Sequence, residues 1–160
     1  MAGVAKGTDL TTLGVKFGYA IESVAGTKPT AFTLLERCRS VGGISLSQEK
    51  IDLTCLEDST KKYGKGQQDT GGDWTVKFLT GAVPQVKAMM VASAAATTGL
   101  RTWFEVWVPG LTDAFFVVAQ PGDKIPLPDV GSNAALEFDI SLTIQEYIGL
   151  QTAVEPTAAT

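Results

Sequence analysis

The chain has 160 residues, of which 44% are hydrophobic and 19% are charged, and its formal net charge is −4. This composition excludes a disordered chain, and the acidic balance argues against a protein that binds nucleic acid through a basic patch. Histidine is absent, which removes the commonest general base and metal ligand, and two cysteines are too few for a disulfide framework. We therefore expect a protein that is not an enzyme and that has no catalytic residue, no metal site and no cofactor.

The length predicts one domain, at residues 14–150, between a polar N-terminal arm at 1–13 and a C-terminal tail at 151–160 without a core-forming pattern. No run reaches the roughly 18 apolar residues of a membrane span, and the N-terminus lacks the apolar stretch of a signal peptide. We expect a protein that is made in a cytoplasm and does not bind membranes.

Alternating apolar residues predict four strands in the first half of the chain. The first two lie at 15–21 and 32–38, and a Gly-Gly pair follows the second. The third and fourth, at 51–55 and 74–78, alternate apolar and polar residues as half-buried strands do. Cys55 lies in the apolar register of the third strand, so we expect a buried thiol there, while a bridge to the other cysteine stays formally open.

The connection between the third and fourth strands, residues 57–73, is long and polar, with four acids, three lysines and four glycines. Hairpins usually close in about two to five residues, so a connection of this length needs a reason. Such a loop moves, binds something, or becomes ordered only against a partner.

One helix is predicted at about 84–97. Pro84 suits the first helical turn, where its missing N–H has no partner to lose, and Gly99 suits the end. An apolar stripe at helical spacing consists of Val86, Met89 and Met90. Since such a stripe usually covers the apolar face of a sheet, we expect the helix to pack there, with a promiscuous binding groove as the less favoured interpretation.

Strands resume at 101–108 and 114–120, and the Pro-rich stretch 120–133 is expected to be a surface connection or an edge. Trp103 and Trp107 fall on one face of their strand. We expect them to be buried beneath the helix, although an exposed aromatic platform is the alternative.

The strand at 136–145 has the most regular pattern, because ten residues alternate without a break. The apolar set is Leu136, Phe138, Ile140, Leu142 and Ile144; the polar set is Glu137, Asp139, Ser141, Thr143 and Gln145. Such a strand needs a sheet with one dry and one wet face, and its wet face carries two acids and no base. The chain is thus predicted to be an α+β, mainly β domain: a β-sandwich or barrel-forming sheet with one flanking helix and a long hairpin-like loop.

The segment 43–76 resembles the major tail tube proteins of long, non-contractile phage tails, within the wider tail-tube and secretion-tube superfamily. In that family an "IDVT-like" strand leads through a long loop to a "D-x-G-x" entry into the next strand. The matching positions here are Ile51, Asp52, Leu53, Thr54, Asp58, Ser59, Asp69, Gly71 and Asp73.

The resemblance implies a structural subunit that forms hexameric rings, stacked as a hollow tube through which DNA is ejected. Residues facing the lumen would be Glu137, Asp139, Ser141, Thr143 and Gln145. Residues of the loop between rings would be Glu57, Asp58, Lys61, Lys62, Tyr63, Lys65, Asp69 and Asp73. Its partners would be itself, the tape measure protein, and the tail-tip, distal tail and tail terminator proteins. DNA would pass without specific binding, in a virion tail assembled in the cytoplasm of the host bacterium.

Two other functions stay open. One is the inner tube of a contractile tail or a secretion machine, which shares the implied fold and differs mainly in its partners. The other is a carbohydrate-binding β-sandwich module, with Trp103 and Trp107 as its exposed platform. Self-assembly distinguishes the tubes from a binding module, which would stay monomeric.

Overall fold

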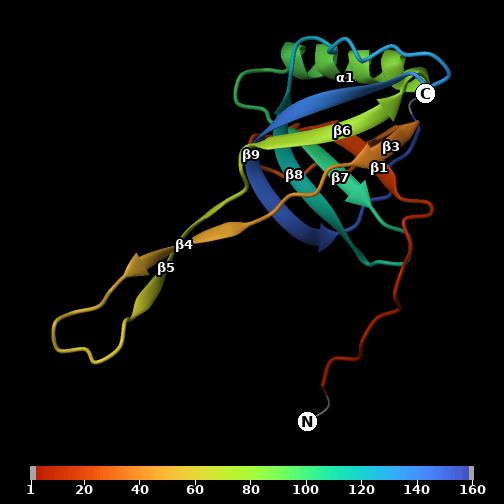
Figure 1. Ribbon diagram of the computed structural model, residues 1–160. Coiled ribbons are helices and arrows are strands. Elements are labelled where there is room, and N and C mark those ends of the chain that lie inside the picture. The colour runs from red at the N-terminus through yellow and green to blue at the C-terminus, as the bar shows by residue number, and fades with distance from the viewer. Residues whose placement is uncertain (1–2, 159–160) are drawn as a thin grey trace.

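The computed structural model describes residues 3–158, and a seven-stranded antiparallel sheet with the order β2-β1-β7-β8-β9-β6-β3 forms its centre (Figure 1). A separate two-stranded sheet joins β4 to β5. The strands are β1 (Lys16–Ile21), β2 (Thr33–Leu35), β3 (Cys38–Val41), β4 (Ser47–Asp52), β5 (Tyr63–Asp69), β6 (Asp73–Leu79), β7 (Thr102–Trp107), β8 (Asp113–Pro121) and β9 (Glu137–Thr152). The expected fold class, mainly β with one α-helix, is confirmed.

The large sheet curls into a partly closed barrel. Its two edge strands, β2 and β3, follow one another in the chain, and the step from Leu35 to Cys38 can span only about 11 Å. Phe17 of β1 therefore meets Trp74 of β6 inside the curl, with ring centroids 5.6 Å apart. The single strand predicted at 32–38 is wrong, because Arg37 has a left-handed backbone (φ 62°) that separates β2 from β3.

A short 3₁₀ turn, η1 (Thr80–Ala82), leads into the helix α1 (Val83–Ala95), which lies across one side of the sheet in Figure 1. The predicted helix is confirmed, although it ends two residues earlier than expected. Val86 and Met89 are fully buried and Met90 nearly so, in the core that also holds Phe17 and Trp74. The stripe thus serves packing on the sheet.

A second apolar layer covers the opposite face of β7 and β8, and it contains Trp103, Phe116 and Phe32. Trp103 is buried as expected, but beneath residues from β1–β2 and the C-terminal segment, so the prediction that it lies under the helix is wrong. Trp107 is half-buried, with the Lys16 ammonium 5.2 Å from its ring centroid. The two indoles therefore do not form an exposed platform on this chain.

The strands β4 and β5 form an arm, residues 47–69, that projects from the body in Figure 1. Every residue of β4 is exposed, so the prediction of a half-buried strand at 51–55 is wrong. Cys55 is also exposed, against the expected buried thiol, and both cysteines are free. The predicted loop 57–73 is partly a strand, because β5 pairs with β4 and leaves only the tip of the arm and a short return without strand structure.

The last strand is longer than predicted. β9 runs for 16 residues, and its buried side chains include Phe138, Ile140 and Leu142, whereas Leu136 precedes the strand and is exposed. The segment that follows packs on the body, with Pro156 buried, although its sequence has no core-forming pattern. Residues 1–2 of the predicted arm and 159–160 of the predicted tail lie outside the described residues.

Candidate assembly surfaces

The predicted site residues lie on two surfaces of the molecule. Seven of the eight loop residues lie on the arm or its tip, and of these only Asp58 is partly buried. The eighth, Asp73, begins β6 and pairs in register with Thr143 of β9. It therefore belongs with the second surface, which consists of the outward side chains of β9 and β6.

The tip of the arm is ordered by its own polar contacts. The Asp58 carboxylate accepts a hydrogen bond from the Cys55 backbone N–H at 2.9 Å and pairs with the Lys62 ammonium at 2.8 Å. These contacts, the Cys55 N–H first, hold the pKa of Asp58 below its usual range. Thr54 accepts from the Lys62 backbone N–H at 2.8 Å. The tip thus has a defined shape before it meets any partner.

Apolar side chains of the arm are exposed on this chain. Leu56 is fully exposed, Leu53 is 61% and Ile51 is 50% exposed. Tyr63 of β5 is also exposed; it lies in register with Asp52, on the other face of the arm, with the Lys50 ammonium 5.7 Å from its ring centroid. An isolated two-stranded hairpin is marginally stable in water, and such side chains gain free energy when another surface covers them. The arm therefore has the physical character of a docking element.

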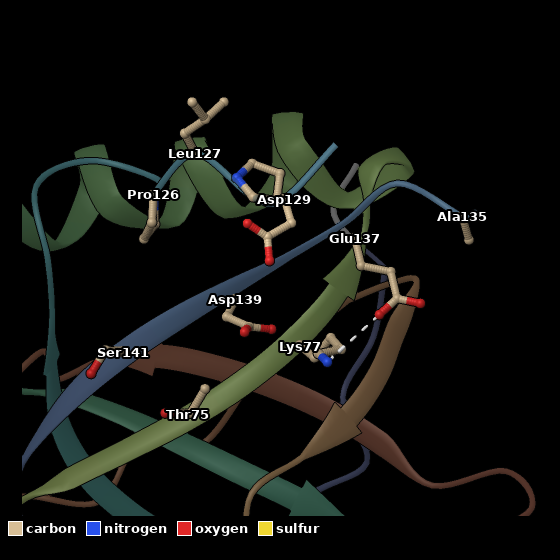
Figure 2. Close-up of a pocket in the computed structure, with 10 residues that line it drawn as sticks. Thr75, Lys77, Pro126, Leu127, Asp129, Ala135, Glu137, Asp139 and Ser141 are labelled. Carbon is tan, nitrogen blue, oxygen red and sulfur yellow. Dashed lines mark ion pairs between the residues drawn. The ribbon is translucent and has the colours of Figure 1, made fainter. Parts of the chain in front are cut away.

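The outward face of β9 lines an open hollow of about 610 Å³, shown in Figure 2. Glu137, Asp139 and Ser141 project into it from β9, beside Thr75 and Lys77 of β6. The β8–β9 connection, at 126–129, forms its roof. Thr143 and Gln145 continue the exposed face farther along β9, where a register shift sets Gln145 outside the ladder with β8.

Neighbouring strands bring positive charge to this face, which the strand alone does not reveal. Arg39 of β3 lies 2.8 Å from the Glu137 carboxylate, and Lys77 of β6 lies 3.7 Å from it. The expectation of a face with acids and no base holds for β9 alone and fails for the surface as a whole. Asp139 forms no ion pair among the described residues, although Lys77 lies opposite it in the β6–β9 register, and Asp129 adds a further acid at the hollow.

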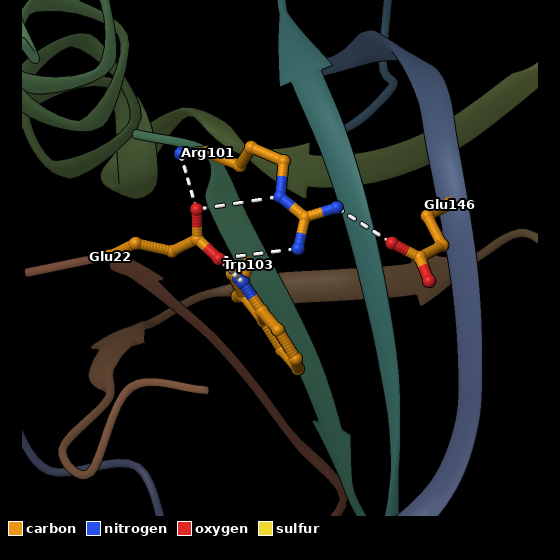
Figure 3. A network of polar contacts seen from close by, with 4 residues as sticks. All are labelled: Glu22, Arg101, Trp103 and Glu146. Atoms are coloured by element: carbon orange, nitrogen blue, oxygen red, sulfur yellow. Dashed lines mark hydrogen bonds and ion pairs between the residues drawn. The ribbon is translucent and has the colours of Figure 1, made fainter. Parts of the chain in front are cut away.

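A buried polar network fixes β7 against β1 and β9, and sequence reasoning missed it (Figure 3). The Glu22 carboxylate accepts hydrogen bonds from Trp103 Nε1 at 2.9 Å and from the Arg101 backbone N–H at 2.8 Å. Burial acts to raise the pKa of Glu22, but the bonds from Trp103 and Arg101 outweigh it and lower that pKa. Arg101 also reaches Glu146 of β9 at 2.6 Å. These contacts tie β7 to the end of β1 and to β9 and so stabilise the sheet.

Comparison with solved structures identifies the fold. A chain in the cryo-EM structure of the anti-feeding prophage cap, the AFP tube-terminating cap, superposes with a TM-score of 0.59 over 95% of this chain and 97% of that chain. This chain shares its fold. The two sequences are 14% identical, so the likeness extends to the fold alone.

A chain in the six-fold symmetrised structure of the anti-feeding prophage baseplate gives a TM-score of 0.49 at 13% identity, over 92% of this chain and 97% of that chain. No protein-family model and no curated protein sequence matches the chain.

Within residues 3–158, no helix is long and apolar enough to cross a membrane. Within the same residues, no three or more acidic or cysteine side chains come together as metal ligands.

Proposed function

We propose that the chain is a structural subunit of a phage-tail-like tube, in which copies associate through the β4–β5 arm. The observation that carries this proposal is the arm itself. It leaves the body, is ordered at its tip, and exposes Ile51, Leu53 and Leu56. A second copy of the chain is the partner that an assembly subunit meets first, and covering these side chains would stabilise the contact.

The rest of the molecule suits this role. The partly closed barrel, the helix α1 and the buried Glu22 network give a rigid body on which an arm and a lumen face can be presented. The shared fold with a chain of a tube-terminating cap supports the same reading. The proposed role is structural and needs no catalysis, since these residues would serve packing and association.

The finer proposal is a hexameric ring, with rings stacked into a hollow tube that conducts DNA during ejection. The arm, with Lys61, Lys65 and Asp69 on its surface, would reach an adjacent ring. The outward face of β9 would line the lumen, where Asp139 provides negative charge that keeps DNA phosphates from binding. Tape measure, tail-tip, distal tail and terminator proteins would contact such a tube, within a virion assembled in the host cytoplasm.

A second candidate is a subunit of the inner tube or of the tube-terminating cap of a phage-tail-like secretion particle. The observation that favours it is the anti-feeding prophage cap chain, whose length this chain covers almost completely. A cap subunit would end a tube, so it would form one ring and add no further rings. A tube subunit would continue to polymerise.

The test is the mass of the purified protein, measured by mass photometry and light scattering over a range of concentrations. The proposal expects hexamers that grow into longer species with concentration, and a chain lacking residues 47–69 that folds and stays short. Hexamers that never lengthen would favour the cap. A monomer at every concentration would refute association as the function.

A further inference from the structure

The C-terminal segment, residues 153–157, closes over the outer face of the sheet and covers one of its edges. Thr157 pairs with β2 through a single parallel β-bridge to Thr33: its N–H donates to Phe32 O at 3.0 Å, and its carbonyl accepts from the Leu34 N–H at 2.7 Å. Pro156 is buried against Gly18, where an added Cβ would lie 2.8 Å from the proline ring. We call this segment the strap.

Beneath the strap lies Glu105, which is fully buried on β7 opposite Gly18. Its Oε2 accepts one hydrogen bond, from the Val154 N–H of the strap, at 2.9 Å. Its Oε1 is buried without any partner, the one such side-chain atom found in residues 3–158. A buried carboxylate is expensive unless its oxygens are paired, so this arrangement needs an explanation.

The charged groups around Glu105 do not remove this cost. Lys28 is the positive charge that acts on Glu105, but the Lys28 ammonium donates to Thr152 O at 2.7 Å and lies 4.2 Å from the Phe116 ring centroid. Asp113 of β8 also interacts electrostatically with the Lys28 ammonium, so Glu105 shares that positive charge with a second acid.

The other charged groups on this side of the sheet are engaged elsewhere. On β1 and the strap, Lys16 and Glu155 pair with each other at 2.7 Å. At the far end of the same face, Glu22 and Arg101 form the network described above.

We propose that Glu105 and the strap form a proton-controlled latch over the edge of β2. With Glu105 neutral, the strap is closed and Thr157 occupies the β2 edge. With Glu105 ionised, the strap lifts so that water reaches Oε1, and the Leu34 N–H and Phe32 carbonyl become free to pair with an extended strand of a second copy. An edge strand with free backbone groups pairs readily with another chain.

The direction of the effect follows from the two states. Burial raises the pKa of Glu105 above its ordinary value near 4.5, against the smaller effects of the Val154 N–H and the Lys28 charge. The closed state therefore binds the proton more tightly than the open state does. Closure is favoured at acid pH and loses free energy as the pH rises from about 4.5 through the raised pKa.

The test is backbone hydrogen exchange read by NMR at pH values from 5 to 8, corrected for the rates of an unstructured peptide. The protection of the Leu34 and Thr157 amides is divided by that of Ile140, which lies in the β6–β9 ladder and reports global opening. We expect this ratio to fall by about tenfold or more across the range in the natural protein. A ratio that stays constant would overturn the proposal.

Two variants sharpen the test. Glu105→Gln keeps an oxygen for the Val154 N–H but cannot ionise, so its ratio should stay high and independent of pH. Glu155→Gln removes an exposed acid of the same strap, and it should keep the fall seen in the natural protein. If the protection ratio still falls with pH in Glu105→Gln, or no longer falls in Glu155→Gln, then a group other than Glu105 controls the strap and the latch is refuted. The readout needs no assembly, so it can fail or succeed independently of the proposed function.

Discussion

Replacing the apolar side chains of the arm should separate association from folding. In the variant Ile51→Ser, Leu53→Ser, Leu56→Ser, the removed side chains are 50%, 61% and 105% exposed on the free chain. Because they already face water, the free energy of unfolding should change by no more than about 0.5 kcal/mol per site. We expect the melting temperature to stay within a few degrees of that of the natural protein.

The same side chains should contribute strongly to the free energy of association once a partner covers them. Fully burying an Ile or Leu side chain yields about 1.5–3 kcal/mol, and the exposed fractions here amount to about two such side chains. A loss of about 3 kcal/mol per contact would raise the concentration needed for assembly about a hundredfold. Light scattering against protein concentration measures this threshold directly.

A matched control keeps the arm and changes only polar side chains. Glu49→Ser with Gln67→Ser alters two exposed residues of β4 and β5, and it should leave the assembly threshold within about twofold of the natural value. If the apolar variant assembles at the natural threshold, the arm does not drive association. If it loses its fold instead, the reading of the arm as separate from the core is wrong.

Three other outcomes are expected. Glu22→Ala should lower the free energy of unfolding by about 3 kcal/mol in urea titrations, because the Trp103 and Arg101 donors lose their acceptor; an unchanged midpoint would contradict this. An alkylating reagent near pH 8 should label exposed Cys55 well before Cys38, whose pKa burial raises to about 11; equal rates would contradict the packing at β3. Asp139→Lys should permit tube assembly but reduce DNA delivery per particle, and unchanged infectivity would remove the charge argument.

Sequence patterns predicted the elements whose burial depends on their own periodicity. The alternation at Phe138, Ile140 and Leu142 and the helical stripe at Met89 and Met90 both identify the side that faces the core, and the structure agrees. In both elements the apolar face is buried within the domain itself, so the periodicity of the local sequence is enough to predict which side chains are buried.

The failures share a different cause. Ile51 and Cys55 alternate like core residues, but no other part of residues 3–158 buries them. The period of a pattern cannot distinguish burial within the chain from burial against a partner. The break between β2 and β3 depends on a positive φ at Arg37, and an arginine in the sequence does not indicate that conformation. Likewise, charged Glu105 is buried only because β1 and the strap, remote in sequence, close over it.

The candidate site was predictable in part. The segment around the arm was singled out by its length and polarity, and the wet face of β9 by its alternation. The bases that pair with Glu137 were not, because Arg39 and Lys77 reach it only through the strand order β9-β6-β3. Surface charge depends on which strands are neighbours, and the alternation within one strand does not determine that order.

The central claim, that copies of this chain build a tube through the arm, is tested most directly by cryo-electron microscopy of the purified protein at high concentration. We expect stacked rings in which residues 47–69 of each copy contact a copy in the next ring and Asp139 faces the channel. Isolated monomers would contradict it, as would rings whose arms point into solvent.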